Sequence, residues 1–181
     1  MDEQIDLGLI AACQQGDPAA FRQVFEHYQD RVYRLCRHMA GNPQDAEDLA
    51  QDSFVQAFGS IQSFKGESAF GTWLFRIAAN CCLSALRKRR AAFVPLDEET
   101  PLPSGSSPED QLMRKELGKR VEAAIAALPE NQRLLFVLGT QLEMPYHQIG
   151  QIAGCSEDAV KMRLHRARQQ VRHALRPYLE S

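Results

Sequence analysis

A helix start signal recurs along this chain and limits it to a helical fold. The signal places a proline in the first helical turn, usually after a capping side chain, at Asp17-Pro18, Asn42-Pro43, Ser107-Pro108 and Leu128-Pro129. Between these points apolar residues recur at intervals of three and four, as in the stripe Phe21, Val24, Phe25, Tyr28, Val32 and Leu35. No run of alternating β-branched residues occurs, so the sequence predicts an all-α fold.

The segment from Ala91 to Asp110 interrupts this helical pattern. It combines prolines with glycine, serines and acidic residues and has no amphipathic period, which is the composition of a linker. We therefore expect two small helical domains, residues 1–91 and 112–181, joined by a flexible linker over residues 92–111. A chain of 181 residues is long enough for this organisation.

Composition excludes several classes of protein. The chain is 44% hydrophobic and 24% charged, as soluble globular proteins are. Its acidic N-terminus does not fit a signal peptide and no window has the apolar length of a membrane span, so we expect a cytoplasmic protein. The 5 cysteines form no C-x-x-C pair and are expected to be reduced and buried or partly buried. The scattered histidines and cysteines predict neither a metal site nor a cofactor.

Basic residues gather in two places, although the formal net charge is only -2. The segment from Val160 to Arg176 contains six lysines and arginines and no acidic residue. A second cluster, RKRR, spans Arg87 to Arg90, whereas acidic residues are concentrated in the expected linker. Separate basic patches on a chain of balanced charge indicate nucleic-acid binding.

A helix-turn-helix pattern occupies the C-terminal part of the chain. The sequence predicts a short helix from Tyr146 to Ala153, a turn at Gly154-Cys155-Ser156, and a longer basic helix that Ser156 caps. In this motif the second helix enters the major groove of DNA, where lysine and arginine reach phosphates and guanine edges. A solvated basic helix in a helical hairpin is the alternative, which the glycine turn and the acid-free basic run disfavour.

Aromatic and basic residues lie together before the linker, in FKGESAFGTWLFRIAAN from Phe64 to Asn80. Phe64 to Ser68 is a short loop, and Phe70 and Trp73 open the helix that follows. Aromatic rings can stack on an unpaired base, cations can hold the backbone, and an amide can contact a base edge. The segment therefore favours binding of an unstacked single strand, although Phe70 and Trp73 alone more often belong to a hydrophobic core.

Four carboxylates stand among apolar residues in DAEDLAQDSF, from Asp45 to Phe54. On a helix Asp45, Asp48 and Asp52 share one face, while the apolar residues cover the opposite side. Metal binding, acid–base chemistry, a solvated face and docking on a basic partner all fit such a helix. A metal-dependent enzyme would need further histidines or carboxylates from other helices, and no such motif occurs in the sequence.

In order and spacing, these motifs resemble those of an extracytoplasmic-function sigma factor, a small two-domain subunit of bacterial RNA polymerase. The resemblance rests on DAEDLAQDSF, SFKGESAFGTWLFRIAAN, LPENQRLLFVL and YHQIGQIAGCSEDAVKMRLHRAR, and it covers nearly the whole chain outside the linker. It implies that the first domain binds core RNA polymerase and melts the minus-ten promoter element, while the second reads the minus-thirty-five element. It also implies contacts with the clamp coiled coil and the flap of the polymerase, and no catalysis or small-molecule substrate.

The resemblance further implies three sets of contact residues. The set for the polymerase clamp lies on the acidic helix: Asp45, Glu47, Asp48, Gln51 and Asp52. The set for the melted minus-ten strand captures a flipped base and holds the backbone: Phe64, Lys65, Gly66, Glu67, Ser68, Arg76, Asn80, Arg87, Lys88, Arg89 and Arg90. The set for double-stranded minus-thirty-five DNA is the recognition helix: Ser156, Glu157, Asp158, Ala159, Lys161, Met162, Arg163, Arg166 and Arg168. Gly150 departs from the family, where alanine is commoner.

Regulation and one alternative function complete the expectations. Members of this family are usually held inactive by an anti-sigma factor, often membrane-bound, until a stress response releases them; such a partner would hold the chain at the inner face of the membrane. The alternative is a one-component helix-turn-helix regulator with a sensor domain. It accounts for the C-terminal motif but leaves the segment from Phe64 to Asn80 as core alone.

Overall fold

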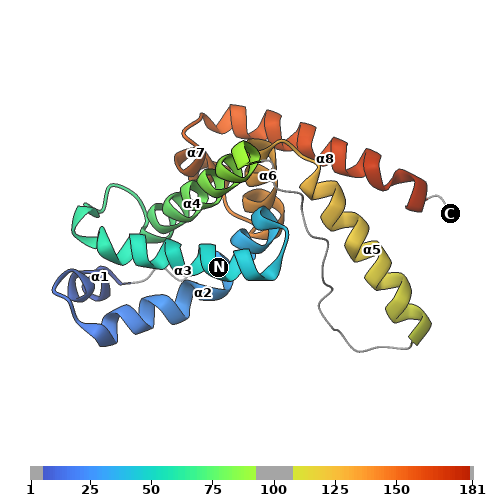
Figure 1. Ribbon diagram of the computed structural model, residues 1–181. Helices are drawn as coiled ribbons and strands as arrows, with labels where there is room; N and C mark the ends of the chain where they lie inside the picture. The colour runs from blue at the N-terminus through green and yellow to red at the C-terminus, as the bar shows by residue number, and fades with distance from the viewer. Residues whose placement is uncertain (1–5, 93–107, 180–181) are drawn as a thin grey trace.

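The computed structural model describes residues 6–92 and 108–179, and every regular element within these ranges is helical. The first domain contains α1 (Leu7–Gln14), α2 (Pro18–Ala40), α3 (Pro43–Gly59), the 3₁₀ turn η1 (Ile61–Ser63) and α4 (Phe70–Ala92). The second contains α5 (Pro108–Ala126), α6 (Glu130–Phe136), the π-helical segment η2 (Val137–Gln141), α7 (Tyr146–Ala153) and α8 (Glu157–Leu179). The predicted all-α class is confirmed (Figure 1). The expected linker, 92–111, lies largely outside the described residues.

All four predicted helix starts are observed. Helices begin at Pro18, Pro43 and Pro108, the prolines of three start signals, and α6 begins at Glu130, directly after the proline of the fourth. The side chain of Asp17 accepts a hydrogen bond from the amide of Ala19 at 2.9 Å, and Asn42 caps α3 in the same way through the amide of Asp45. These caps satisfy amides that have no partner within their own helix, so they fix where each helix begins.

The core of the first domain lies between α2, α3 and α4, and α1 packs on α2. Its largest fully buried side chains come from α2 and α4: Phe75, Leu35, Met39, Leu74, Val24 and Val32. Truncating one fully buried leucine typically costs about 2–5 kcal/mol of stability. The heptad-like spacing of the α2 residues therefore accounts for the position of this helix at the centre of the domain.

The second domain packs α8 across α5, α6 and α7, and it also contacts the first domain. Its own core contains Ile125, Leu135, Val137, Leu138, Ile149 and Leu164. Helix α7 packs on α4, and α5, α6 and η2 lie against α2. Figure 1 shows α7 beside α4, with α5 extending away from the first domain. In the described part of the chain, no helix has the length and apolar content to cross a membrane.

Candidate nucleic-acid interfaces

A cavity of about 340 Å³ opens where the loop after η1 meets the first turns of α4. It is lined by Ser63, Phe64, Lys65, Glu67, Ser68, Thr72, Trp73 and Arg76 of the first domain, and by Gln151 of the second. Cavities that hold small organic ligands have volumes of about 300–1,000 Å³, so one unstacked base fits here. The loop and α4 thus bring aromatic, cationic and polar groups to a single base-sized space.

Two aromatic rings, those of Phe64 and Trp73, line this cavity, and Phe70 packs against both of them in the core. The ring centroid of Phe64 lies 5.3 Å from that of Phe70, and these two rings meet edge to face. The Phe64 centroid lies 5.5 Å from that of Trp73. Phe64 is 8% exposed and Trp73 is 7% exposed, so both rings are largely core side chains that also reach the cavity. The core interpretation of these aromatics is therefore confirmed, and stacking on a base stays a prediction.

The loop is held in place from the N-terminal side. The side-chain amide of Gln14, at the end of α1, donates hydrogen bonds to the carbonyls of Ile61 and Phe64 at 3.1 and 3.0 Å. Gly66 has a φ of 75°, in the left-handed region where glycine is favoured, so the loop turns at this residue. These hydrogen bonds of Gln14 could not be predicted from the sequence, because they join residues 47 and 50 positions apart.

The cavity gathers part of the predicted single-strand set and adds residues outside that set. Phe64, Lys65, Glu67, Ser68 and Arg76 line it, whereas Asn80 is exposed one turn further along α4 and does not. The added residues are Ser63, Thr72, Trp73 and Gln151. The hydroxyl of Thr72 is buried here without a hydrogen-bond partner. Buried polar groups normally have a hydrogen-bond partner, so this hydroxyl has the capacity to bond a group that enters the cavity.

The four residues of the basic cluster at the end of α4 are not equivalent. Arg87, Lys88 and Arg90 are exposed. Arg89 is half-buried, because its guanidinium pairs with the carboxylate of Asp45 on α3 and donates a hydrogen bond to the carbonyl of Ala40 at 3.3 Å. Arg89 therefore joins α4 to α2 and α3, and the other three cations remain available to a phosphate backbone.

The helix-turn-helix forms as predicted. Helix α7 spans Tyr146–Ala153, Gly154 makes the turn with a φ of 64°, and the hydroxyl of Ser156 accepts a hydrogen bond from the amide of Ala159 at 3.3 Å. A side-chain carbon at Gly150 would lie 2.7 Å from the carbonyl oxygen of Cys155, closer than such contacts allow. Glycine at this position, the departure from the family noted above, therefore lets the turn approach α7.

The outer face of α8 is basic, with an acidic first turn. Lys161, Met162, Arg163 and Arg166 are exposed, and Glu157 and Asp158 lie 3.6 and 3.4 Å from the ammonium of Lys161. A hydrogen bond from Lys161 to Asp158, together with the charges of both carboxylates, raises the pKa of Lys161. The positive charge of Lys161 is thus partly neutralised within the helix.

Two further cations of the recognition helix differ in what they contact. The guanidinium of Arg168 lies 3.4 Å from the hydroxyl of Thr140 and 3.5 Å from the carbonyl of Gly139, on the π-helical segment η2. Arg166 lies 3.8 Å from the sulfur of Met162 on its own helix. Arg168 therefore connects α8 to η2, and Arg163 stays exposed on the face predicted to meet DNA.

The acidic helix α3 presents four of the five predicted clamp residues to solvent. Glu47, Asp48, Gln51 and Asp52 are exposed, together with Val55, which is 65% exposed and was not predicted. The fifth, Asp45, is half-buried between Arg89 and the side chain of Asn42, which donates a hydrogen bond to it at 2.8 Å. Among the described residues, no group of three or more histidines, cysteines or carboxylates is arranged to hold a metal ion.

Family models match both domains of the chain. Sigma-70 region 2 matches residues 24–92, and Sigma-70 region 4 matches residues 118–171. The region 2 match covers the acidic helix and the residues of the first domain that line the cavity. A one-component regulator, the alternative considered above, gives no reason for such a match in the first domain.

Relatives and solved structures match over nearly the whole chain. The chain is 34% identical to the extracytoplasmic-function RNA polymerase sigma factor SigW of Bacillus subtilis, covering 92% of this chain and 95% of that protein. It is 34% identical to the sigma-E factor of Haemophilus influenzae, covering 99% of this chain and 100% of that protein.

Two solved structures share the fold. The structure of CnrH in complex with the cytosolic domain of CnrY has a TM-score of 0.73 at 27% identity, covering 93% of this chain and 96% of that one. The sigma factor RpoE of Bartonella quintana, in complex with the anti-sigma factor NepR, has a TM-score of 0.70 at 25% identity, covering 86% of this chain and 96% of that one. With regions 2 and 4 in order along one chain and full-length relatives at this identity, the chain belongs to the extracytoplasmic-function sigma factors, the promoter-directing subunits of bacterial RNA polymerase.

Proposed function

We propose that this protein is a cytoplasmic, non-catalytic subunit that binds core RNA polymerase as an alternative sigma factor and selects its promoters. Residues 1–91 would dock on the clamp and melt the minus-ten element, and residues 112–181 would read the minus-thirty-five element. Residues 92–111 would run between them as a linker toward the active-site channel. The base-sized cavity beside Phe64, Trp73 and Arg76 is the observation that carries this proposal, because it suits a single unstacked base.

In the first domain, a flipped base enters the cavity and contacts its aromatic wall and polar groups. Lys65 and Arg76 stand at the cavity, where cations hold the adjacent phosphates. Arg87, Lys88 and Arg90 extend the basic path along α4. Asn80 contacts the strand outside the cavity, on the exposed side of α4. This division assigns base recognition to the loop and backbone binding to the helix.

In the second domain, the N-terminal half of α8 enters the major groove. Arg163 is the first choice for a base contact, because it is exposed and two guanidinium donors can pair with a guanine edge. Met162, 54% exposed, offers an apolar contact to a thymine methyl. Ser156, Glu157, Asp158 and Ala159 begin the helix and set its approach.

The exposed face of α3 docks on the clamp coiled coil. Glu47, Asp48, Gln51 and Asp52 present negative charge and an amide, and Val55 adds apolar surface at the same face. Charge complementarity of this kind guides association and orientation more than it adds affinity. Asp45, held by Arg89, supports the helix rather than the partner.

An anti-sigma factor is the second proposed partner. The solved structures similar to this chain include RpoE of Bartonella quintana bound to the anti-sigma factor NepR and CnrH bound to the cytosolic domain of CnrY. Since the chain matches both over most of their length, a comparable inhibitor would hold it away from polymerase. If that inhibitor is anchored in the membrane, the chain would be held at its inner face.

Transcription in vitro tests the proposal. Core RNA polymerase, the purified protein and a pool of genomic fragments should yield transcripts whose start sites share two upstream elements. Arg76→Ala and Arg163→Ala should each lower promoter-dependent transcript by about tenfold, because one lost nucleic-acid contact costs roughly 1–3 kcal/mol. Lys119→Ala, which removes an exposed cation on α5, serves as the matched control. Absence of any promoter-dependent transcript with the wild-type protein would overturn the proposal.

A further inference from the structure

The base-sized cavity contains polar groups whose bonding capacity the fold does not use. The hydroxyl of Thr72 on α4 has no hydrogen-bond partner, and this residue is only 3% exposed. Within the described parts of the chain, the side chains of Lys65, Glu67, Arg76 and Gln151 also form no hydrogen bond or ion pair. Because a buried hydroxyl normally has a partner, we expect a ligand that supplies one here.

The cavity has a buried inner end and an exposed mouth. Phe64, Trp73 and Thr72 are at most 8% exposed, whereas Lys65 and Arg76 are exposed. Thr72 and Arg76 are four residues apart on α4, so their side chains are neighbours on one face of the helix. Aromatic rings suit the face of a planar base, and cations suit a phosphate group. A nucleotide that enters base first therefore meets rings at the inner end and cations at the mouth.

Two serine hydroxyls that line the cavity have already used their hydrogens. Ser63 donates to the carbonyl of Ser60 at 2.7 Å, and Ser68 donates to the carbonyl of Ala69 at 3.3 Å. Their oxygens therefore keep only the capacity to accept a hydrogen bond from a ligand. An acceptor pairs with an amino group and not with a keto oxygen. The lining thus favours a base with an exocyclic amino group, such as adenine.

Glu67 at the mouth favours a free ribonucleotide over a DNA strand. Its exposed carboxylate lines the cavity and can only accept hydrogen bonds. The 2′- and 3′-hydroxyls of ribose are donors of the kind that carboxylates bind in nucleotide sites. A DNA strand has no 2′-hydroxyl, and its 3′-oxygen is esterified. The sugar of a free ribonucleotide therefore offers Glu67 a partner that the sugar of DNA lacks.

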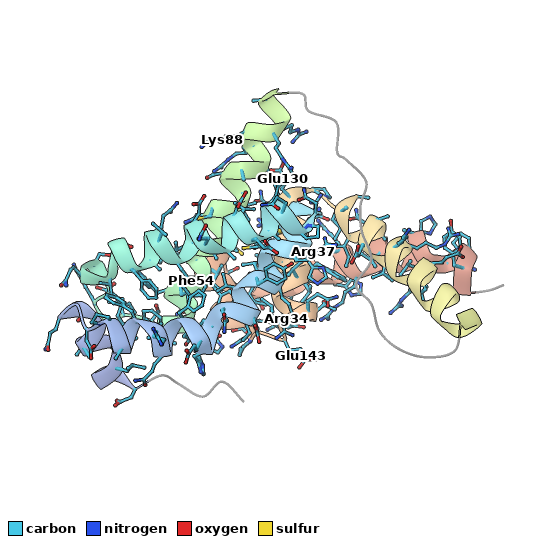
Figure 2. All side chains as sticks on the ribbon, turned by 60° about the horizontal axis from the view of Figure 1, so that its bottom comes forward. Arg34, Arg37, Phe54, Lys88, Glu130 and Glu143 are labelled. Carbon is cyan, nitrogen blue, oxygen red and sulfur yellow. The ribbon has the colours of Figure 1, made fainter. Side chains whose placement is uncertain are left out.

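The second domain contributes an amide to the same cavity. Gln151 is exposed on α7, and the packing of α7 on α4 places it there. Two polar contacts also join the domains: Arg133 of α6 donates to the carbonyl of Met39 of α2 at 3.1 Å, and Arg37 of α2 lies 3.7 Å from Glu122 of α5. Figure 2 shows Arg37 on α2 at this domain boundary. A ligand in the cavity therefore lies beside both domains.

We propose that the free protein binds a ribonucleoside 5′-phosphate with an amino-bearing base in this cavity. The base lies against Phe64 and Trp73. The ribose lies beside Glu67, and the phosphate lies at Lys65 and Arg76. Such binding needs neither promoter DNA nor polymerase, so it goes beyond the proposed function. Mutual exclusion of the nucleotide and a promoter base is the one consequence that rests on the proposed function, which brings that base to the same cavity.

The fluorescence of Trp73 tests the site directly, because this is the only tryptophan of the chain and it lines the cavity. The probe is AMP, with N-acetyltryptophanamide as the correction for absorption by the nucleotide. We expect a saturable change with a Kd of about 0.1–1 mM. The compounds dAMP, adenosine and IMP lack the 2′-hydroxyl, the phosphate and the amino group, respectively. Each should bind about threefold to tenfold more weakly than AMP.

Substitution of Glu67 assigns the ribose contact. Glu67→Ala should bind AMP and dAMP equally, since the acceptor for the 2′-hydroxyl is removed. Glu116→Ala, which removes an exposed carboxylate on α5, should keep the wild-type preference for AMP. Equal affinity of the wild-type protein for AMP, dAMP and IMP would overturn the proposal. Absence of a saturable response to AMP would overturn it too.

Substitution of Thr72 assigns the contact at the inner end. Thr72→Val keeps the shape of the side chain and removes a hydroxyl that has no partner in the protein. We therefore expect AMP affinity to fall by about threefold to tenfold, with no loss of stability in urea unfolding. Gln151→Ala should lower AMP affinity by about threefold, because the amide of the second domain also lines the cavity. Wild-type AMP affinity in both variants would contradict the assigned position of the ligand.

Displacement and transcription keep this site distinct from the proposed function. AMP should release a fluorescein-labelled single-stranded DNA from the wild-type protein as it fills the cavity. A promoter-dependent transcript without a saturable response of Trp73 to AMP would overturn the nucleotide site alone. A saturable response to AMP with no promoter-dependent transcript would overturn the proposed function and support the nucleotide site.

Discussion

Cysteine thiols in the first domain are enclosed by its helices. Cys13, Cys36 and Cys82 are at most 1% exposed and Cys81 is 8% exposed. The sulfur of Cys82 lies 3.8 Å from that of Cys36, and this hydrogen bond, together with burial and the neighbouring thiols, raises the pKa of Cys82. Burial also raises the pKa of Cys13 and of Cys81. Since the thiolate is the reactive form, these residues are packing side chains, as the sequence predicted.

Thiol labelling of the native protein tests this assignment. Cys155, in the turn of the helix-turn-helix, is half-exposed, so about one thiol per chain should react rapidly with an aromatic disulfide reagent. All 5 should react once the chain is unfolded in guanidinium. Cys155→Ser should abolish the rapid phase and leave the total lower by one. Rapid reaction of any thiol in that variant would show that the first domain opens more readily than the burial of its cysteines indicates.

Among the helices, those with strong local signals were predicted from the sequence. Helices α7 and α8 begin where glycine, the serine cap and the apolar spacing placed them. Helix α1 was not assigned from the sequence, since it is short and its apolar residues do not form a clear stripe. The hydrogen bonds by which its last residue, Gln14, holds the loop after η1 are long-range contacts. The π-helical segment η2 was also missed, because its geometry depends on packing against Arg168 and Leu164 rather than on local propensity.

Helix α3 separates partner contacts from internal ones, and this division is testable. Asp48→Arg combined with Gln51→Ala should weaken binding to core polymerase by about tenfold or more, because it reverses charge on the exposed face. Thermal stability should change by less than about 0.5 kcal/mol, as for other surface substitutions. The measurement is a titration of labelled protein with core polymerase, followed by thermal unfolding of the same variant.

Asp45→Ala is the matched comparison on the same helix. Asp45 pairs with Arg89 and is hydrogen-bonded to Asn42, so its loss should lower stability by about 1 kcal/mol. Polymerase affinity should stay within about twofold of wild type. Core binding that is unaffected by the double substitution but reduced by Asp45→Ala would move the docking face to the side of α3 that meets α4.

At the scale of the whole molecule, the arrangement of the two domains was not predictable from the sequence. It depends on Arg133 reaching Met39, a contact 94 residues apart in the chain, and on the pairing of Arg37 with Glu122. Neither pair follows a local spacing rule. In the sequence alone, nothing distinguishes either arginine from an ordinary surface cation. Single-strand residues such as Phe64 and Arg76 could be named because their motif is local, whereas Gln151 reaches the cavity only through domain packing.

A histidine near this domain boundary makes stability depend on pH. His38 is half-buried on α2; burial lowers its pKa, and the charges of Arg37 and Arg34 lower it further, while that of Glu122 opposes them. The unfolded chain titrates near the ordinary value of 6.5. The folded protein therefore binds a proton at His38 less readily than the unfolded chain does. The stability contribution is complete above pH 6.5 and is lost as the pH falls toward the lower, folded-state pKa.

Urea unfolding at about pH 7.5 and about pH 5.5, followed by helical circular dichroism, measures this contribution. Wild-type protein should lose more stability on acidification than His38→Gln, whose amide does not titrate. His173→Gln, a change at an exposed position of α8, should retain the wild-type pH dependence. Because Glu122 favours the protonated form of His38, Glu122→Gln should increase the loss of stability at the lower pH. Equal acid sensitivity of the wild type and His38→Gln would assign the pH dependence to other groups and show that His38 has the same pKa in the folded and the unfolded chain.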